Sequence, residues 1–223
     1  RSSDLALSRS LAVHRTHFER RAVMVAADRT DLLDALRTVA RGEDSPNCVQ
    51  TGDEMISGKV AFVFPGQGSQ WTGMCRDLWA ESEVFRTEFT RCDAALRPHT
   101  GWSAVDVLNG RSDAPTLDGD DIVQPMLFAT MVSLAAMWRA VGVTPDAVVG
   151  HSQGEIAAAV VSGAIGLEAA AAVVTIRTRA LSRISGGAMA SVGLPVAALE
   201  GRLGSHVSVA AVNSQASTVL AGD

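Results

Sequence analysis

Two short, almost wholly apolar segments, each followed at once by a glycine-containing turn, constrain the fold of this chain more than any other feature. Residues 60–64 read VAFVF and residues 147–149 read AVV. Runs this short and continuous are typical of strands buried on both faces, as in parallel sheets. Helical patterns cover about 77–96 and 126–141 and begin again at 154. Strands that alternate with helices predict an α/β fold built on a parallel sheet.

The two ends of the chain differ from this central part. Near the start, a first helix is followed by a strand pattern over 21–27, a helix over 32–39 and a linker-like run over 42–58 that is rich in Gly, Asp, Ser, Pro, Asn and Thr. Near the end, strands over 188–194, 207–213 and 218–221 enclose a predicted helix over 195–203. This β-α-β-β order is that of the first two-thirds of a ferredoxin-like β-α-β-β-α-β unit. The predicted parts are a small α+β module (1–56), a large subdomain (57–186) and an incomplete small subdomain (187–223).

Composition excludes several classes of protein. The formal net charge of −5 argues against a phosphate-driven nucleic-acid binder. The three cysteines form no CxxC pair, which predicts a reducing compartment and no structural zinc. No secretory signal opens the chain, and the apolar stretches 125–141 and 154–176 carry Arg139, Glu155 and Glu168. We therefore expect core helices rather than membrane spans, and a soluble, cytoplasmic protein.

The segment Gly150-His151-Ser152-Gln153-Gly154 fits the G-x-S-x-G pattern of a nucleophile on a sharp strand-to-helix turn. A buried strand is predicted before it and an apolar helix after it. Small residues let the backbone turn sharply, and the free N–H groups of a helix N-terminus stabilise an anion. Ser152 is therefore a candidate nucleophile. The alternative is a plain glycine-rich turn with an idle serine.

A second candidate loop, Pro65-Gly66-Gln67-Gly68-Ser69-Gln70, follows the first strand of the large subdomain. It is neither a dinucleotide fingerprint, because Trp71 stands where the third glycine would be, nor a P-loop, because the only lysine is Lys59. Gln67, flanked by glycines at the end of a strand, could direct its amide at a developing oxyanion. A plain tight turn remains the alternative.

Arg177 is the candidate anion-binding residue. It lies 25 residues after Ser152 and ends an apolar run, which predicts partial burial. A buried arginine needs an anionic partner, either a substrate carboxylate held bidentately or an internal acid such as Glu155 or Glu168. The general base is harder to place. His151 adjoins the serine on a turn where neighbouring side chains diverge, and no other histidine is well placed by sequence. The others are His14, His17, His99 and His206.

Residues 64–70 and 150–155, taken together, resemble the acyltransferase domain of modular polyketide synthases and, more distantly, the malonyl-CoA:ACP transacylases. The resemblance covers residues 59–223 almost continuously. Residues 1–56 resemble the linker that joins ketosynthase to acyltransferase in those enzymes. The resemblance implies an α/β-hydrolase-like large subdomain with part of a ferredoxin-like small subdomain.

The resemblance also implies a role for each matching residue. Ser152 corresponds to the nucleophile, the Gln153 N–H and the region of Gln67 to the oxyanion hole, and Arg177 to the residue that pairs with the free carboxylate of a malonyl-type extender. The implied donor is a coenzyme A thioester, the acceptor is the phosphopantetheine of an acyl carrier protein, and the neighbour is a ketosynthase domain. No bound cofactor, metal, nucleic acid or membrane is implied. The base histidine of the family follows the ferredoxin-like subdomain, beyond Asp223, so we expect residues 1–223 alone to be catalytically silent. We also expect them to be poorly soluble, because the incomplete ferredoxin-like unit leaves an unpaired strand edge and an uncovered apolar face.

The extender unit is predicted from residues near the serine. In the resembled family, an aliphatic-Val-Gln run such as Ile122-Val123-Gln124 and a glutamine after the nucleophile, here Gln153, accompany methylmalonyl use. Val123, Gln124 and His151 are therefore expected at the substrate site. One methyl group is worth only ~1–3 kcal/mol of discrimination, so malonyl and ethylmalonyl remain open.

Two rival functions remain at this stage. A serine esterase or thioesterase would use the same G-x-S-x-G turn, but a hydrolase of neutral esters has no use for a buried cation such as Arg177. A non-catalytic docking scaffold would need no intact serine turn, although residues 1–56 fit that role by themselves.

Overall fold

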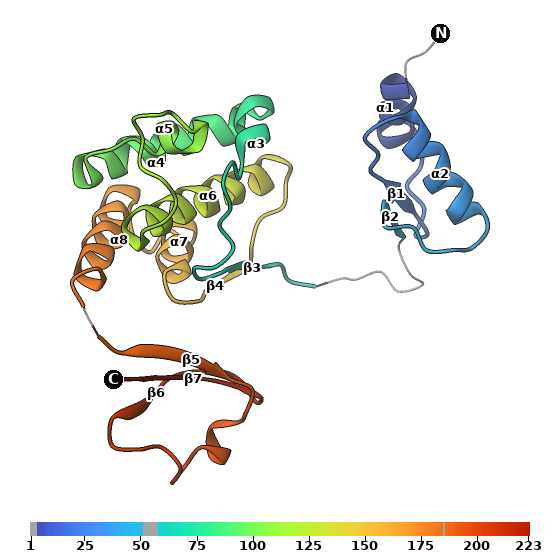
Figure 1. Ribbon diagram of the computed structural model, residues 1–223. Coiled ribbons are helices and arrows are strands. Elements are labelled where there is room, and N and C mark those ends of the chain that lie inside the picture. Colours follow the sequence, from blue (N-terminus) through green and yellow to red (C-terminus); the bar gives the residue numbers. More distant parts are fainter. Residues whose placement is uncertain (1–3, 51–57, 185) are drawn as a thin grey trace. The chain divides into compact units, whose positions relative to one another are not determined.

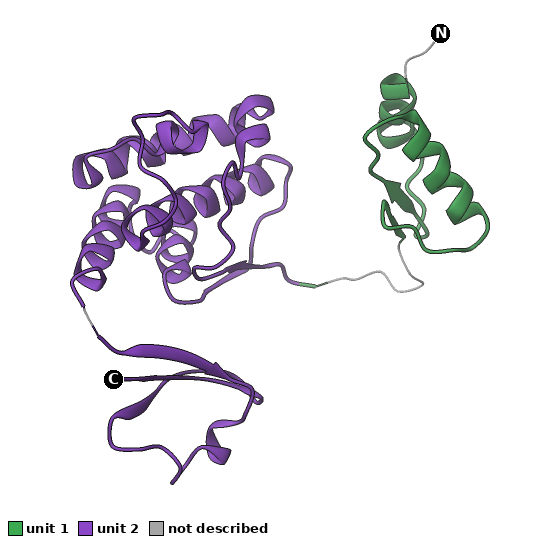
Figure 2. Ribbon diagram, viewed as in Figure 1, with its two compact units in different colours: residues 1–58 green, residues 59–223 purple. Residues whose placement is uncertain are grey.

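The computed structural model describes residues 4–50, 58–184 and 186–223 (Figure 1). The chain divides into two compact units, residues 1–58 and residues 59–223 (Figure 2). The first predicted boundary, between residues 56 and 57, lies outside the described residues. The division into three parts therefore stays a prediction.

The first unit is a small α+β module. Its elements are α1 (Asp4–His14), β1 (Ala22–Met24), α2 (Arg29–Ala40) and β2 (Cys48–Gln50). Asp28 caps α2, since its side chain accepts a 3.0 Å hydrogen bond from the Asp31 N–H. The predicted linker over 42–58 is wrong in part, because it contains β2. That strand exists through its antiparallel pairing with β1, which its own polar flanks do not reveal.

The larger part of the second unit is a layer of helices on a parallel strand pair. Strand β3 (Ala61–Phe64) pairs in parallel with β4 (Ala147–Gly150), with Phe64 opposite Gly150. Both strands therefore end at the same edge, and the His151 N–H donates a 2.9 Å hydrogen bond to the Phe64 carbonyl. The helices are α3 (Arg76–Glu81), α4 (Glu83–Thr100), α5 (Ala104–Asn109), α6 (Asp120–Ala140), α7 (Gly154–Val161) and α8 (Leu167–Leu181).

Two helix predictions in this part of the second unit are corrected by the structure. The single helix expected over 77–96 is α3 followed by α4, because Ser82 leaves the helical conformation and caps α4 through the Phe85 N–H. Helix α4 also continues beyond residue 96, through Pro98 to Thr100, so His99 lies in its last turn. Helix α6 begins at Asp120, six residues before the predicted start, and runs through Pro125. Tertiary packing outweighs the hydrogen bond that this proline removes.

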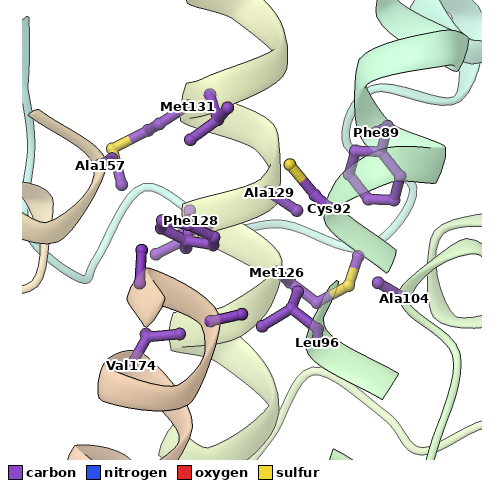
Figure 3. Close-up of a cluster of buried hydrophobic side chains, with 14 of the residues drawn as sticks. Phe89, Cys92, Leu96, Ala104, Met126, Phe128, Ala129, Met131, Ala157 and Val174 are labelled. Atoms are coloured by element: carbon purple, nitrogen blue, oxygen red, sulfur yellow. The ribbon is translucent and has the colours of Figure 1, made fainter. Parts of the chain in front are cut away.

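Helix α6 forms the centre of the hydrophobic core. Figure 3 shows Met126, Phe128 and Ala129 of α6 packed between Phe89, Cys92 and Leu96 of α4 and Val174 of α8, all with at most 1% of their surface exposed. By length and composition alone α6 could span a membrane. However, 72% of its most apolar window is buried inside the protein, and this burial accounts for its composition.

The strand pair is not buried on both faces, contrary to expectation. The helices lie on one side of β3 and β4 (Figure 1), where Phe64 is buried. On the other side, 71% of Val63 and 54% of Val149 are exposed. Among the residues that the structure describes, therefore, the continuous apolar runs face the core with only half of their side chains.

The last part of the second unit is a three-stranded sheet. Strands β5 (Ala188–Val192), β7 (Ser217–Gly222) and β6 (Val207–Ser214) lie in that order, and β7 is antiparallel to both neighbours. This is the order of the first three strands of a ferredoxin-like unit. The helix predicted over 195–203 is wrong. Only a 3-10 turn, Val196–Ala198, forms there, because an isolated helix this short gains too few hydrogen bonds to offset nucleation.

Candidate active site

Ser152 occupies the turn between β4 and α7 in a strained conformation. Its φ of 50° lies in the left-handed region, which residues other than glycine rarely adopt. The flanking glycines make this turn possible. A Cβ at position 150 would lie 2.3 Å from the Glu155 nitrogen, and one at 154 would lie 2.2 Å from the Phe64 carbonyl oxygen. The predicted sharp turn is present and presents an exposed serine at the start of a helix.

The loop after β3 lies directly against this turn. A Cβ at Gly66 would lie 2.9 Å from His151 Nδ1 and 3.6 Å from Ser152 Cβ. In the described part of the chain, no hydrogen bond occupies the backbone N–H of Gln67 or of Gln153. Both groups are therefore free to receive an oxyanion next to the serine.

The side chain of Gln67 does not point at the serine, as the sequence had suggested that it could. Its Nε2 donates to Asp120 Oδ1 at 2.6 Å, and its Oε1 accepts from Gln124 Nε2 at 2.9 Å. Any part that Gln67 has in an oxyanion hole therefore falls to its main chain. The side-chain amide belongs to a hydrogen-bond network instead.

Arg177 of α8 is half-buried, as predicted, and reaches the serine. Its Nη2 lies 3.4 Å from Ser152 Oγ, and its Nη1 donates to Gln124 Oε1 at 2.6 Å. No salt bridge among residues 4–50, 58–184 and 186–223 includes Arg177, so neither Glu155 nor Glu168 neutralises it. An amide oxygen satisfies part of the guanidinium but leaves its charge unpaired. The site thus holds a cation beside a serine hydroxyl.

Val123, expected at the substrate site, and Gln153, expected in the oxyanion hole, both have side chains that lie in the core. Val123 of α6 has 1% of its surface exposed, and Gln153 has none. Both side-chain polar atoms of Gln153 lack a hydrogen-bond partner among the described residues. Burial of an amide without hydrogen-bond partners costs free energy. Gln153 is therefore an exception to the rule that buried polar groups are hydrogen-bonded, and packing alone does not explain it.

His151 is exposed and turned toward the small sheet. Its Nε2 lies 3.1 Å from Asn213 Oδ1 of β6. No histidine ring nitrogen in the described ranges hydrogen-bonds to Ser152, whose partner is Arg177. This geometry agrees with the expectation that His151 is poorly placed as the base.

Sequence reasoning missed Asp120 and Asn213. Asp120 was missed because the helix was expected to start after Pro125. Residues 120–124 were therefore not assigned to any face of a helix. Asn213 was missed because β6 is distant from His151 in the sequence. A helical reading of 120–124, which puts Asp120 and Gln124 one turn apart on the same face, could have pointed to the first of them.

The glycine-supported serine, the free N–H groups and the unpaired arginine together define an acyl-transfer type of site, and the sequence comparison gives the same class. Residues 61–223 match the model of the family described as "Acyl transferase domain". The chain belongs to this family.

Curated relatives with high similarity to the chain are polyketide synthases. The chain is 49% identical over 221 residues to polyketide synthase GfsB of Streptomyces halstedii, covering 97% of the chain and 4% of the relative. It is 48% identical over 222 residues to erythronolide synthase EryA3 of Saccharopolyspora erythraea, covering 98% of the chain and 7% of the relative. The chain therefore spans only a small part of these proteins.

Solved structures show the same similarity. The acyltransferase domain from module 8 of the salinomycin polyketide synthase matches with a TM-score of 0.89 and 44% identity, over 100% of this chain and 53% of that one. The acyl transferase domain of SpnD, solved in complex with 2-(pent-4-yn-1-yl)malonyl, matches with a TM-score of 0.81 and 32% identity, over 99% of this chain and 51% of that one. The chain thus spans about half the length of these solved domains.

Proposed function

We propose that the chain carries the serine half of an acyltransferase site that moves an extender unit, methylmalonyl, from coenzyme A to an acyl carrier protein. One observation carries the proposal. The guanidinium of Arg177 lies 3.4 Å from the hydroxyl of Ser152 and has no acidic partner among the described residues. A cation in that position suits an acyl group that bears a free carboxylate.

The first half-reaction forms an acyl-enzyme. Ser152 Oγ attacks the thioester carbonyl carbon, the carbon–sulfur bond breaks, and coenzyme A leaves as the thiol with the proton that the serine loses. The backbone N–H groups of Gln67 and Gln153 stabilise the negative oxygen of the tetrahedral intermediate. The family resemblance assigns the proton transfer to a histidine that follows Asp223.

The second half-reaction transfers the acyl group to the carrier. The thiol of phosphopantetheine attacks the Ser152 ester, and the serine recovers its proton. The partners that follow are an acyl carrier protein and a neighbouring ketosynthase domain, in the cytoplasm. Support comes from the curated relatives, which are polyketide synthases many times longer than this chain. Coenzyme A is a substrate in this scheme, and no bound cofactor or metal takes part.

Methylmalonyl is the extender that the local sequence favours. Val123, Gln124 and Gln153 follow the pattern that accompanies this extender in the resembled family. Further support comes from SpnD, whose solved complex contains a substituted malonyl group. Malonyl and ethylmalonyl are the alternatives, because a single methyl group changes binding by only ~1–3 kcal/mol.

The experiment compares acyl-enzyme formation by intact-mass spectrometry in the protein that carries this chain. With methylmalonyl-CoA, Ser152→Ala should gain no acyl mass. Arg177→Ala should form the methylmalonyl ester roughly 100-fold more slowly, because the carboxylate loses its partner, while the propionyl ester should form at a comparatively unchanged rate. Arg179→Ala is the matched control, since Arg179 lies on the same helix and donates to the His99 carbonyl.

Three results would contradict the proposal. An undiminished adduct in Ser152→Ala would place the nucleophile elsewhere. An equal loss of both acyl groups in Arg177→Ala would make the arginine structural. Release of free acid at the same rate with and without carrier protein would favour the esterase alternative.

A further inference from the structure

A continuous line of hydrogen bonds joins the serine to an acidic residue that the family resemblance does not include. Arg177 Nη2 donates to Ser152 Oγ at 3.4 Å, and its Nη1 donates to Gln124 Oε1 at 2.6 Å. Gln124 Nε2 then donates to Gln67 Oε1 at 2.9 Å, and Gln67 Nε2 donates to Asp120 Oδ1 at 2.6 Å. The four bonds connect a cation to an anion through two amides.

The two ends of this line fix the orientation of both amides. A carboxylate only accepts hydrogen bonds and a guanidinium only donates them, whereas each glutamine amide does one at each end. Asp120 therefore requires the NH2 group of Gln67, which turns the Gln67 oxygen to Gln124 and the Gln124 oxygen to Arg177. With either amide reversed, a donor would face a donor. The charges of Asp120 and Arg177 at the two ends also strengthen the hydrogen bonds between them cooperatively.

We propose that Asp120 is a positioning residue for the carboxylate-binding guanidinium of Arg177. It acts through Gln67 and Gln124 and touches neither substrate nor serine. By holding the Gln124 oxygen on Nη1, it keeps Nη2 directed at the space beside Ser152. This inference rests on the proposed function, because it assumes that Arg177 binds the acyl carboxylate.

A second explanation for Asp120 must be separated from this one. Asp120 and Asp121 both lie in the first turn of α6, where negative charge stabilises a helix N-terminus. Only Asp120 hydrogen-bonds to Gln67. Asp121 is therefore a matched control, because its charge stabilises the helix N-terminus in the same way but its side chain makes no hydrogen bond to Gln67.

The test measures kcat and KM of the protein that carries this chain with methylmalonyl-CoA and with propionyl-CoA. Loss of one charge-assisted hydrogen bond at an exposed site should raise the methylmalonyl KM roughly tenfold in Asp120→Ala, with kcat and the propionyl constants little changed. Asp120→Asn keeps an acceptor oxygen and should recover most of the loss. Asp120→Lys accepts no hydrogen bond, reverses both amides and should be the worst variant. Asp121→Ala should change neither substrate.

Nuclear magnetic resonance gives a readout that does not depend on activity. The side-chain amide proton signals of Gln67 and Gln124 should both shift in Asp120→Ala and stay in place in Asp121→Ala. Unshifted signals in Asp120→Ala, or equal kinetic effects of the two alanine variants on both substrates, would overturn the inference. If instead Arg177→Ala itself fails to separate the two acyl groups, the proposed function fails, and the amide signals still report whether Asp120 orders the network.

Discussion

At the scale of single residues, the turn around Ser152 depends on a position that has no room for a side chain. The space beside Gly154 is filled by two carbonyl oxygens at the end of β3 and the start of the loop after it, those of Phe64 and Pro65. Backbone atoms cannot move aside as a flexible side chain can. The close approach of the two loops, which brings Gln67 next to the serine turn, therefore depends on a missing Cβ.

Gly154→Ala should accordingly be severe. Its Cβ would lie 2.2 Å from the Phe64 oxygen, so the two loops must separate. We expect the free energy of unfolding to fall by about 3 kcal/mol and acyl-enzyme formation to be lost. Gly166→Ala is the control, because its Cβ would meet only Glu168 Oε2 at 3.8 Å. Equal thermal stability of the two variants would refute the packing argument.

The cysteines provide a second prediction at this scale. Burial raises the pKa of the Cys92 thiol to about 12, and it also raises the pKa of Cys75. At pH 8 only about one Cys92 in ten thousand would be a thiolate, the form that reacts with iodoacetamide. Peptide mapping should find Cys92 unmodified in the native protein and modified in denaturant. Rapid native labelling would show that α4 opens.

The same shift has a consequence at high pH. A thiol whose pKa is higher in the folded protein than in the unfolded chain favours the folded state while it is protonated. This contribution is complete below the unfolded value of 9.0 and is lost as the pH rises toward about 12. Cys92→Ser should therefore lessen the alkaline loss of stability, which denaturant titrations at pH 8 and pH 11 would measure.

At the scale of elements, α6 connects stability with chemistry. Its buried length contacts α4, α7 and α8, and its first turns hold Asp120 and Gln124 in the network of the site. The same helix thus belongs to the hydrophobic core and to the site. Its packing against α4 therefore fixes the position of the Gln124 amide.

Removal of the Phe89 ring should test this interface. Phe89 of α4 is fully buried and stacks on Phe85 with ring centroids 5.5 Å apart. Phe89→Ala should lower the free energy of unfolding by about 3–5 kcal/mol through the cavity it leaves. Val84→Ala on the same helix, at a residue that is 40% exposed, should cost far less. Denaturant titrations of both variants would contradict this account if their midpoints coincide.

At the scale of the whole molecule, an apolar groove lies open on the second unit among the described residues. A groove of about 540 Å³ runs along β3 and α6, and its lining includes Val63, Leu127, Leu134 and Trp138. Val63 is 71% exposed and Trp138 is 55% exposed. Contiguous exposed apolar surface beside a strand edge favours association.

We expect residues 1–223 on their own to self-associate through this groove. Val63→Lys places a charge on it and should lower the mean mass measured by light scattering, while leaving the circular dichroism spectrum unchanged. Val173 on α8 is 49% exposed and lies outside the groove, so Val173→Lys should leave the mass unchanged. A monomeric parent chain, or an equal effect of both lysines, would show that the groove is not responsible.

The amino-acid sequence was sufficient for features that depend on neighbouring residues. The alternation of strands and helices, the sharp turn at Ser152 and the partial burial of Arg177 were all predicted, and the structure contains them. Each follows from a local rule, either the pattern of apolar residues along the chain or the space that a glycine leaves. The order β5-β7-β6 also agrees with the predicted ferredoxin-like unit.

Only the tertiary structure decided features that need distant residues to meet. The start of α6 at Asp120 and the exposure of Val63 depend on which surfaces pack together, because packing outweighs the local preference of a proline or an apolar run. The link from Asp120 through Gln67 and Gln124 to Arg177 joins three segments of the chain. A pattern along the sequence cannot show it, because hydrogen bonds between side chains require the atoms to lie about 3 Å apart, and the fold alone sets that distance.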